Sequence, residues 1–206
     1  MWYPKVGRLF YKKGWNRGGK LNFKQPKNET ETHFLLKEIS KYILFGWGYK
    51  ILATEVSGMW DLDIGKKRKE IIDCVGLKKV RVAPRKFHYD MKGIEAKASL
   101  SDFNNGFCCA SAYTYIICPI NTIPIDTIPK DIGVIEVDLS IFEMKKYSQK
   151  ISDMKGVSLV RKAKKRIDSR FKDEEAYRKW CERSLERVAY RCGSELLFWR
   201  NFIEFS

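Results

Sequence analysis

The stretch IEAKASLSDF, residues 94–103, predicts a short strand, a turn and the start of a helix. Side chains alternate between the two faces of a strand, so we expect Glu95 and Lys97 to point one way and Ile94 and Ala96 to point into a core. A carboxylate and an ammonium on a mostly apolar strand are costly to bury unless they are paired or functional. This charged pair is therefore the first candidate for a functional site.

Composition indicates a folded protein with an acidic partner. The 206 residues are enough for one hydrophobic core with an appended element, and 44% of them are hydrophobic. The chain has 40 Lys and Arg against 25 Asp and Glu, a net charge of +15. This excess favours a polyanion, nucleic acid before an acidic membrane surface.

The six cysteines include no C-x-x-C pair, and His33 and His88 are the only histidines. A zinc site of the usual spacing is therefore not expected, and the thiols are predicted to be reduced and buried. The sequence shows neither a signal-peptide pattern nor an apolar run of 18 residues. We therefore expect a cytoplasmic protein that does not enter a membrane.

Three parts are predicted along the chain: a basic aromatic arm over 1–28, a core over 29–143 and a basic helical extension over 144–206 packed on that core. The arm alternates cations with aromatic rings, which suits phosphate contact and base stacking, or else packing of the rings on the core. In the extension, apolar residues at four-residue spacing from Leu159 to Phe171 predict a helix, and a second helix is expected from Asp173 onward.

The core pattern predicts an α/β fold. Helices are expected at 30–45 and about 102–112, and strands at 49–56, 70–75, 91–97, 113–118 and 133–138. Residues 77–90 are predicted to be a basic connection between the second and third strands. The order α-β-β-β-α-β favours a mixed central sheet flanked by helices.

Asp73 is the only charge inside the apolar run of the second predicted strand, and it joins Glu95 and Lys97 as a candidate catalytic residue. Two carboxylates on adjacent strands are suited to Mg²⁺, and the carbonyl of Ala96 would complete its protein ligands, with Mn²⁺ as a substitute. A nearby lysine would orient a water molecule and stabilise developing negative charge. This chemistry fits hydrolysis of a phosphodiester.

Asp73 followed by Glu95-Ala96-Lys97 resembles the D…(D/E)-x-K signature of the PD-(D/E)xK, or restriction-endonuclease-like, nucleases. More narrowly, IEAKASLSDF followed by YTYIICP and IPKDIGVIEVD is similar to the DNA-repair nuclease-like family called MmcB. The resemblance covers about residues 30–138 and implies a restriction-endonuclease-like core.

The same resemblance implies a further acid on the first helix. This acid would be Glu38, or Glu31 earlier in the helix, and Glu55 on the first strand is another candidate. The chain departs from the family pattern in having Ile72, not proline, before Asp73.

The leading hypothesis is a Mg²⁺-dependent DNA endonuclease acting on double-stranded or branched DNA, in a repair or phage context, with a homodimer as one arrangement. Contacts with phosphates are expected from Lys12, Lys13, Arg17, Lys78, Lys79, Arg81, Arg85, Lys86, Lys162, Lys165 and Arg166. The alternatives are a non-catalytic nucleic-acid-binding protein on the same fold and a small phage-type protein-interaction factor.

Plain structural roles compete at each position of the candidate site. Glu95 and Lys97 would form a surface ion pair of little energetic value, and Asp73 would shape a turn. Asp102 is expected to cap a helix rather than to bind a ligand. Asp61 and Asp63 are predicted to be loop acids that replace Asp73 if the strand assignment shifts.

Overall fold

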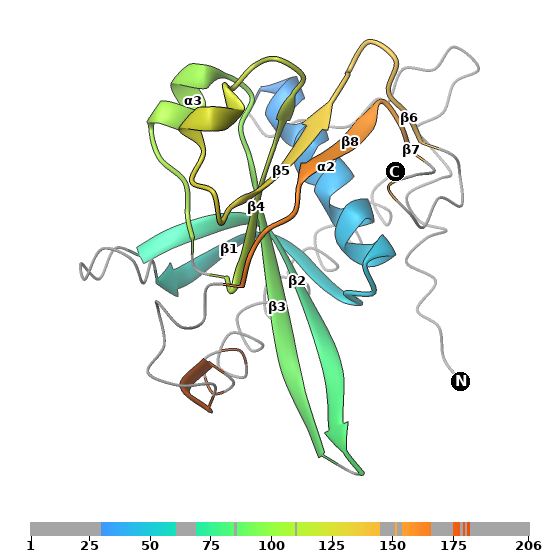
Figure 1. The fold of residues 1–206 in the computed structure, drawn as a ribbon, viewed down its shortest axis with the longest axis vertical. Coiled ribbons are helices and arrows are strands. Elements are labelled where there is room, and N and C mark those ends of the chain that lie inside the picture. Colours follow the sequence, from blue (N-terminus) through green and yellow to red (C-terminus); the bar gives the residue numbers. More distant parts are fainter. Residues whose placement is uncertain are drawn as a thin grey trace, which may run out of the picture.

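The computed structural model describes residues 30–60, 69–84, 86–109, 111–144, 151, 154–165, 175–177, 179 and 181. Within this part, helix α2 (Glu31–Gly46) lies across a six-stranded sheet (Figure 1). The sheet contains β1 (Ile51–Trp60), β2 (Lys69–Ala83), β3 (Lys86–Ala96), β4 (Tyr113–Pro119), β5 (Gly133–Val137) and β8 (Val157–Arg161), in that spatial order. The short helix α3 (Leu100–Asn104) and the 3-10 turn η1 (Ile125–Thr127) connect strands.

Strand directions make the sheet mixed. Strand β3 pairs in parallel with β4, and β4 with β5, while the β1–β2, β2–β3 and β5–β8 pairs are antiparallel. Strands β6 (Glu143–Met144) and β7 (Met154–Lys155) form a separate two-stranded sheet. The predicted order α-β-β-β-α-β and the mixed α/β sheet are therefore confirmed.

Helix α2 begins and ends where the sequence predicts. The Thr30 side chain accepts a hydrogen bond from the backbone N–H of His33, and Gly46 and Gly48 lie at the other end. Its apolar side packs on the sheet through a cluster of buried residues that includes Leu36, Ile39, Ile43, Ile94, Ala96, Ile117 and Ile135. This burial fixes the helix above the middle strands.

The opposite face of the sheet has its own core. The side chains that β1, β2 and β3 bury there include Ala53, Val56, Ile72, Val75, Leu77 and Met91, and they are covered by Cys108, Ala112, Tyr177 and Cys181. The five described cysteines, at 74, 108, 109, 118 and 181, are buried and form no disulfide, as expected, while Cys192 lies outside the described residues. Among the helices described, none is long and apolar enough to cross a membrane.

Three sequence predictions need correction. The helix expected over 102–112 ends at Asn104, because Gly106 adopts a φ of +97° that stops it. The helix expected from Leu159 begins instead as strand β8, so the sheet draws on residues on both sides of position 144. A spacing of four residues is close to one helical turn and is also twice the two-residue repeat of a strand, which explains this error. Residues 166–174, where the helix was expected to continue, lie outside the described part.

The third correction concerns residues 77–90, which form a paired hairpin and not a connection. Strand β2 pairs with β1 only as far as Leu77, and β3 pairs with β4 only from Lys92. Beyond these points β2 and β3 pair with each other up to Ala83 and Lys86. We call this two-stranded projection, residues 78–91, the ribbon, and it extends well away from the sheet (Figure 1). Its many charges hid the strand pattern in the sequence.

The base of the ribbon is fastened by Asp90. One oxygen of its carboxylate accepts a hydrogen bond from Tyr49 Oη at 2.8 Å, and the other accepts one from Tyr177 Oη at 3.0 Å. Tyr177 Oη also accepts from the backbone N–H of Met91 at 3.2 Å. Burial raises the pKa of both phenols, so they remain donors to Asp90 at neutral pH.

Tyr177→Phe should lower the free energy of unfolding by about 1–2 kcal/mol, because it removes the hydroxyl that joins Asp90 to the backbone of Met91. Tyr49→Phe, which removes one hydrogen bond to the same carboxylate, should cost less. Urea unfolding followed by circular dichroism measures both. Wild-type stability of Tyr177→Phe would contradict docking of this tyrosine at the ribbon base.

Candidate active site

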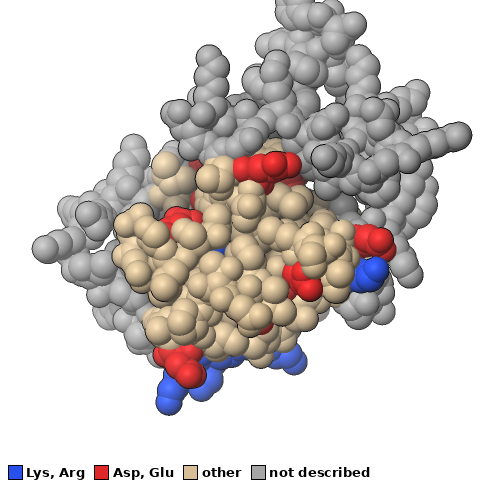
Figure 2. All heavy atoms as spheres, turned by 90° about the horizontal axis from the view of Figure 1, so that it is seen from above, with Lys and Arg blue, Asp and Glu red and all other residues tan. Residues whose placement is uncertain are grey.

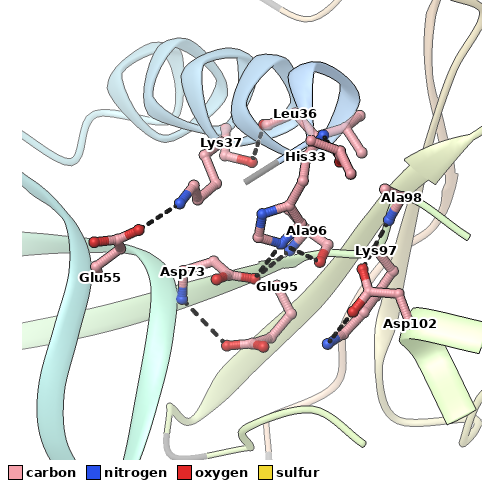
Figure 3. Close-up of polar contacts among 12 residues, drawn as sticks. His33, Leu36, Lys37, Glu55, Asp73, Glu95, Ala96, Lys97, Ala98 and Asp102 are labelled. Carbon is pink, nitrogen blue, oxygen red and sulfur yellow. Dashed lines mark hydrogen bonds and ion pairs between the residues drawn. The ribbon is translucent and has the colours of Figure 1, made fainter. Parts of the chain in front are cut away.

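Strands β2 and β3 diverge at Asp73 and Glu95. The backbone ladder between them ends at the pair Cys74–Ile94, and the next two residues opposite each other are these acids. In place of a ladder hydrogen bond, the N–H of Ala96 donates to Asp73 Oδ2 at 2.9 Å, and the N–H of Asp73 donates to Glu95 Oε1 at 3.4 Å (Figure 3). Each carboxylate is thus held by the backbone of the other strand, and the site brings together Asp73, Glu95 and Ala96 as expected.

Glu95 and Lys97 are buried, with exposed fractions of 3% and 7%. The alternative of an exposed surface ion pair is therefore wrong. Burial raises the pKa of Glu95 well above its usual range, and the charge of Asp73 raises it further. Lys97 and the backbone N–H groups of Asp73 and Cys108 act in the opposite direction. This carboxyl is held in an environment that favours a bound cation or a proton.

Asp102 has a different role from the expected helix cap. Ser99 caps α3, because its hydroxyl accepts from the N–H of Asp102 at 3.1 Å. Asp102 Oδ2 accepts from the N–H of Ala98 at 3.0 Å, and Oδ1 lies 3.6 Å from Lys97 Nζ. Asp102 therefore holds the turn after β3 and orients Lys97, the first residue after this strand (Figure 3).

His33 belongs to the cluster, although the sequence analysis did not select it. From the first turn of α2, its Nε2 lies 3.0 Å from the carbonyl oxygen of Ala96 and 3.4 Å from Asp73 Oδ2 (Figure 3). A carbonyl oxygen only accepts hydrogen bonds, so Nε2 is the protonated nitrogen in this arrangement. One imidazole nitrogen thus reaches two oxygens that were expected to bind a metal.

Lys37, one turn after His33, extends the cluster to β1. Its Nζ lies 2.7 Å from Glu55 Oε1, and Lys37 is only 4% exposed. Glu55 lies between the paired residues Thr54 and Val56, directly opposite Asp73 in the register. Acids of three adjacent strands therefore stand at one level of the sheet, and the helix supplies a cation to the outermost.

Glu55 has a φ of +51°, the left-handed region that costs a residue with a side chain about 1 kcal/mol or more. Strained backbone of this kind is concentrated at functional sites. Glu55, left open in the sequence analysis, thus joins the cluster through Lys37. The other candidate acids of α2 lie elsewhere, because Glu38 pairs with Lys41 and Glu31 is exposed in the first turn.

The sequence contains one signal that could have identified the helical residues of this site. His33 and Lys37 are four residues apart, which places them on one face of a helix. That face also carries Leu36 toward the core, so the polar pair projects onto the sheet from the same side. The sequence alone did not indicate which helical residue would reach Asp73, since the resemblance drew attention to acids.

The expected DNA-contacting cations are distributed over several segments. Lys78, Lys79 and Arg81 are exposed on the ribbon, and Lys162 and Lys165 are exposed after β8. Lys86 is the first residue of β3. Outside the described residues lie Lys12, Lys13, Arg17, Arg85 and Arg166, together with Asp61 and Asp63. The face seen from above in Figure 2 shows scattered Asp and Glu, with Lys and Arg mainly at its rim.

The donor set fits a hard divalent cation. Asp73 Oδ2 and the carbonyl oxygen of Ala96 both lie within 3.4 Å of one atom, His33 Nε2, so the two oxygens face the same donor. Glu95 is fastened beside them. In the described part of the chain, no three His, Cys, Asp or Glu side chains are already arranged as metal ligands. The expected set comprises two carboxylates and a backbone oxygen, the oxygen ligands that Mg²⁺ accepts.

No family model and no curated protein matches the chain. Among solved structures, it is similar to the SPO1766 protein of unknown function from Silicibacter pomeroyi. The two chains are 17% identical over 82% of this chain and 92% of that one, with a TM-score of 0.44.

Glu95→Gln should gain stability relative to wild type as the pH rises. The folded protein holds the Glu95 proton to a higher pH than the unfolded chain does, so wild type loses stability between the ordinary pKa of 4.5 and the raised folded value. Urea unfolding in EDTA at several values between about pH 5 and pH 8 measures the difference between the two proteins. A difference that stays constant with pH, or moves in favour of wild type, would contradict this electrostatic account.

Proposed function

We propose that this protein is a metal-dependent DNA endonuclease with a restriction-endonuclease-like core. The observation that carries the proposal is the convergence of Asp73, Glu95 and the Ala96 carbonyl where β2 and β3 diverge, with Lys97 as the next residue. This is the position and order of the D…(D/E)-x-K signature that the sequence resembles. The element order α-β-β-β-α-β supports the same assignment.

Asp73, Glu95 and the Ala96 carbonyl are the residues that would hold Mg²⁺, with Mn²⁺ able to replace it. When bound, the ion would neutralise charge on the scissile phosphate and lower the pKa of a water molecule. Between them, the backbone N–H groups of Asp73 and Ala96 keep the two carboxylates in place before any ligand arrives. Such preorganisation avoids the cost of ordering the ligands during the reaction.

Lys97 supplies the second part of the chemistry. Its buried ammonium is held by Asp102, 3.6 Å away, and Lys97 directly follows the last residue of β3, two residues after Glu95. An ammonium with three donors orients an attacking water and stabilises negative charge on the phosphate oxygens. Asp102 acts through Lys97 as a positioning residue, and His33 positions Asp73 and the Ala96 carbonyl.

DNA is the substrate that the charge distribution favours. The chain carries a net charge of +15, while the cluster itself is acidic. Phosphates are attracted by the surrounding cations, and the scissile phosphate needs a bound cation to approach Glu55, Asp73 and Glu95. An acidic site on a basic protein is therefore suited to metal-dependent cleavage of a polyanion.

Asp73→Asn and Lys97→Ala should each reduce cleavage of supercoiled plasmid in Mg²⁺ by a factor of about 100 or more. Asp73→Asn is the more informative variant, because its amide oxygen can still accept a hydrogen bond from the N–H of Ala96, which preserves the fold. Gel electrophoresis of nicked and linear products measures the rate, and EDTA should abolish it. Asp126→Asn, an exposed acid in η1, is the matched control for contaminating nuclease. Cleavage at the wild-type rate by both site variants, or DNA binding without any cleavage by wild type, would overturn the proposal.

His33→Ala should lower the cleavage rate by a factor of about 10–100, the usual cost of losing a group that orients metal ligands. Glu38→Gln should change the rate by less than a factor of about three, since its carboxylate pairs with Lys41 within the helix. The same plasmid assay compares the two. A large loss in Glu38→Gln with no loss in His33→Ala would restore the acid as the helical member of the site.

A further inference from the structure

One face of the ribbon combines cations with aromatic rings. Directly opposite residues of an antiparallel pair share a face, and the register pairs Lys79 with Tyr89 and Arg81 with Phe87. We call these four residues the ribbon patch. The other face carries the pairs Lys78–Asp90 and Val80–His88. Tyr89 is partly buried against the core at the base of this face, so the patch places two exposed cations beside one exposed ring, without an acid among its members.

Phe87 is presented to solvent and not to a core. It is 48% exposed, and Lys79 Nζ lies 4.3 Å from its ring centroid. A cation over one ring stabilises the pair by only about 0.5–1 kcal/mol at an exposed site, too little to explain a large apolar ring near the tip of a hairpin. Lys79 and Arg81 are also exposed. The patch has the composition of a recognition surface.

The ribbon is built as a projecting arm. Six residues on each strand extend beyond the rest of the sheet, a reach of about 20 Å at the usual rise per residue. A two-stranded hairpin alone is marginally stable in water, and here the base is fastened through Asp90 to Tyr49 and Tyr177. Rigid attachment at the base lets the tip meet a partner in a fixed orientation.

The partner that fits is a strand of nucleic acid with unpaired bases. Lys79 and Arg81 supply positive charge for contact with phosphates, and an exposed phenylalanine stacks on a base that has left the duplex. Bases within intact duplex already stack on one another, so they offer Phe87 no free face. An anionic membrane would also attract the cations, but Phe87 is the one exposed apolar side chain of the patch, which is little apolar area for insertion into a bilayer.

We propose that the ribbon patch binds single-stranded segments of DNA, so that the substrates are gapped, flapped or branched molecules. This rests on the proposed function in taking DNA as the substrate, and it deepens that function by naming the substrate class. Along β2, Lys79 lies six residues from Asp73 and Arg81 lies eight, which corresponds to about 20–27 Å. The unpaired segment would then lie between half a turn and one turn of duplex from the scissile phosphate.

Fluorescence anisotropy with labelled gapped duplex, single strand and intact duplex tests the proposal, in EDTA to prevent cleavage. Wild type should bind the gapped molecule and the single strand more tightly than intact duplex. Phe87→Ala should weaken binding to these two by a factor of about 10, with little effect on intact duplex and an unchanged salt dependence. Lys79→Ala with Arg81→Ala should weaken binding to all three and reduce the salt slope by about one to two.

Two further substitutions isolate stacking. Phe87→Trp should bind gapped DNA at least as tightly as wild type, whereas Phe87→Leu, which stays apolar but loses the ring, should behave like Phe87→Ala. The matched control is Phe45→Ala with Lys50→Ala, because Lys50 Nζ lies 3.7 Å from the ring centroid of Phe45, which is 39% exposed. This pair lies outside the ribbon, and its removal should leave binding unchanged.

The outcomes separate this proposal from the proposed function. The ribbon proposal would be overturned if Phe87→Leu bound gapped DNA with wild-type affinity, or if the control pair lost as much binding as the Phe87 variants. It would also be overturned if, in a parallel assay with phosphatidylserine vesicles, the Phe87 variants lost binding to the vesicles and not to DNA. Loss of gapped-DNA binding in the Phe87 variants of a protein that does not cleave in Mg²⁺ would support the ribbon proposal and overturn the endonuclease. Thermal unfolding of each variant confirms that the fold is retained.

Discussion

The constraint on which the site depends is that the carboxylates of Asp73 and Glu95 each accept a backbone hydrogen bond from the neighbouring strand. Ladder pairing between β2 and β3 stops at Cys74 and Ile94, and the strands would separate with unsatisfied backbone groups unless something replaced it. The carboxylate of Asp73 accepts a hydrogen bond from the N–H of Ala96, and the carboxylate of Glu95 accepts one from the N–H of Asp73. Because these bonds fix both acids, the same residues that end the ladder are aligned at the opening between the strands.

Such a concentration of acids is unfavourable without compensation, and the surrounding elements provide it. Helix α2 directs Lys37 to Glu55 and His33 to Asp73, while the turn after β3 places Asp102 beside Lys97. Burial and the charge of Asp73 nevertheless raise the pKa of Glu95. The cluster is therefore only partly neutralised by the protein itself, which is the electrostatic condition that a divalent cation would complete.

The sequence indicated the strand acids but not His33 and Lys37 of the helix, for a physical reason. Asp73 and Glu95 interrupt apolar strand patterns, so their cost is visible in the sequence, and Lys97 follows at the spacing that shares a face. His33 and Lys37 lie on a helix where polar residues are common, and only the packing of α2 shows that they reach the sheet. The strands of the ribbon were not predicted because their many charges obscure the strand pattern. Strand β8 was not predicted because a four-residue spacing of apolar residues fits both the helical and the strand period.

The central claim is that Asp73, Glu95 and the Ala96 carbonyl bind a divalent cation. Anomalous diffraction from a crystal soaked in Mn²⁺ tests it most directly, because the anomalous signal identifies the ion and gives its position. The account predicts one anomalous peak at about 2.1 Å from an oxygen of each of the three groups. A peak bound by other residues, or none at this position in crystals of protein that cleaves DNA in Mn²⁺, would contradict it.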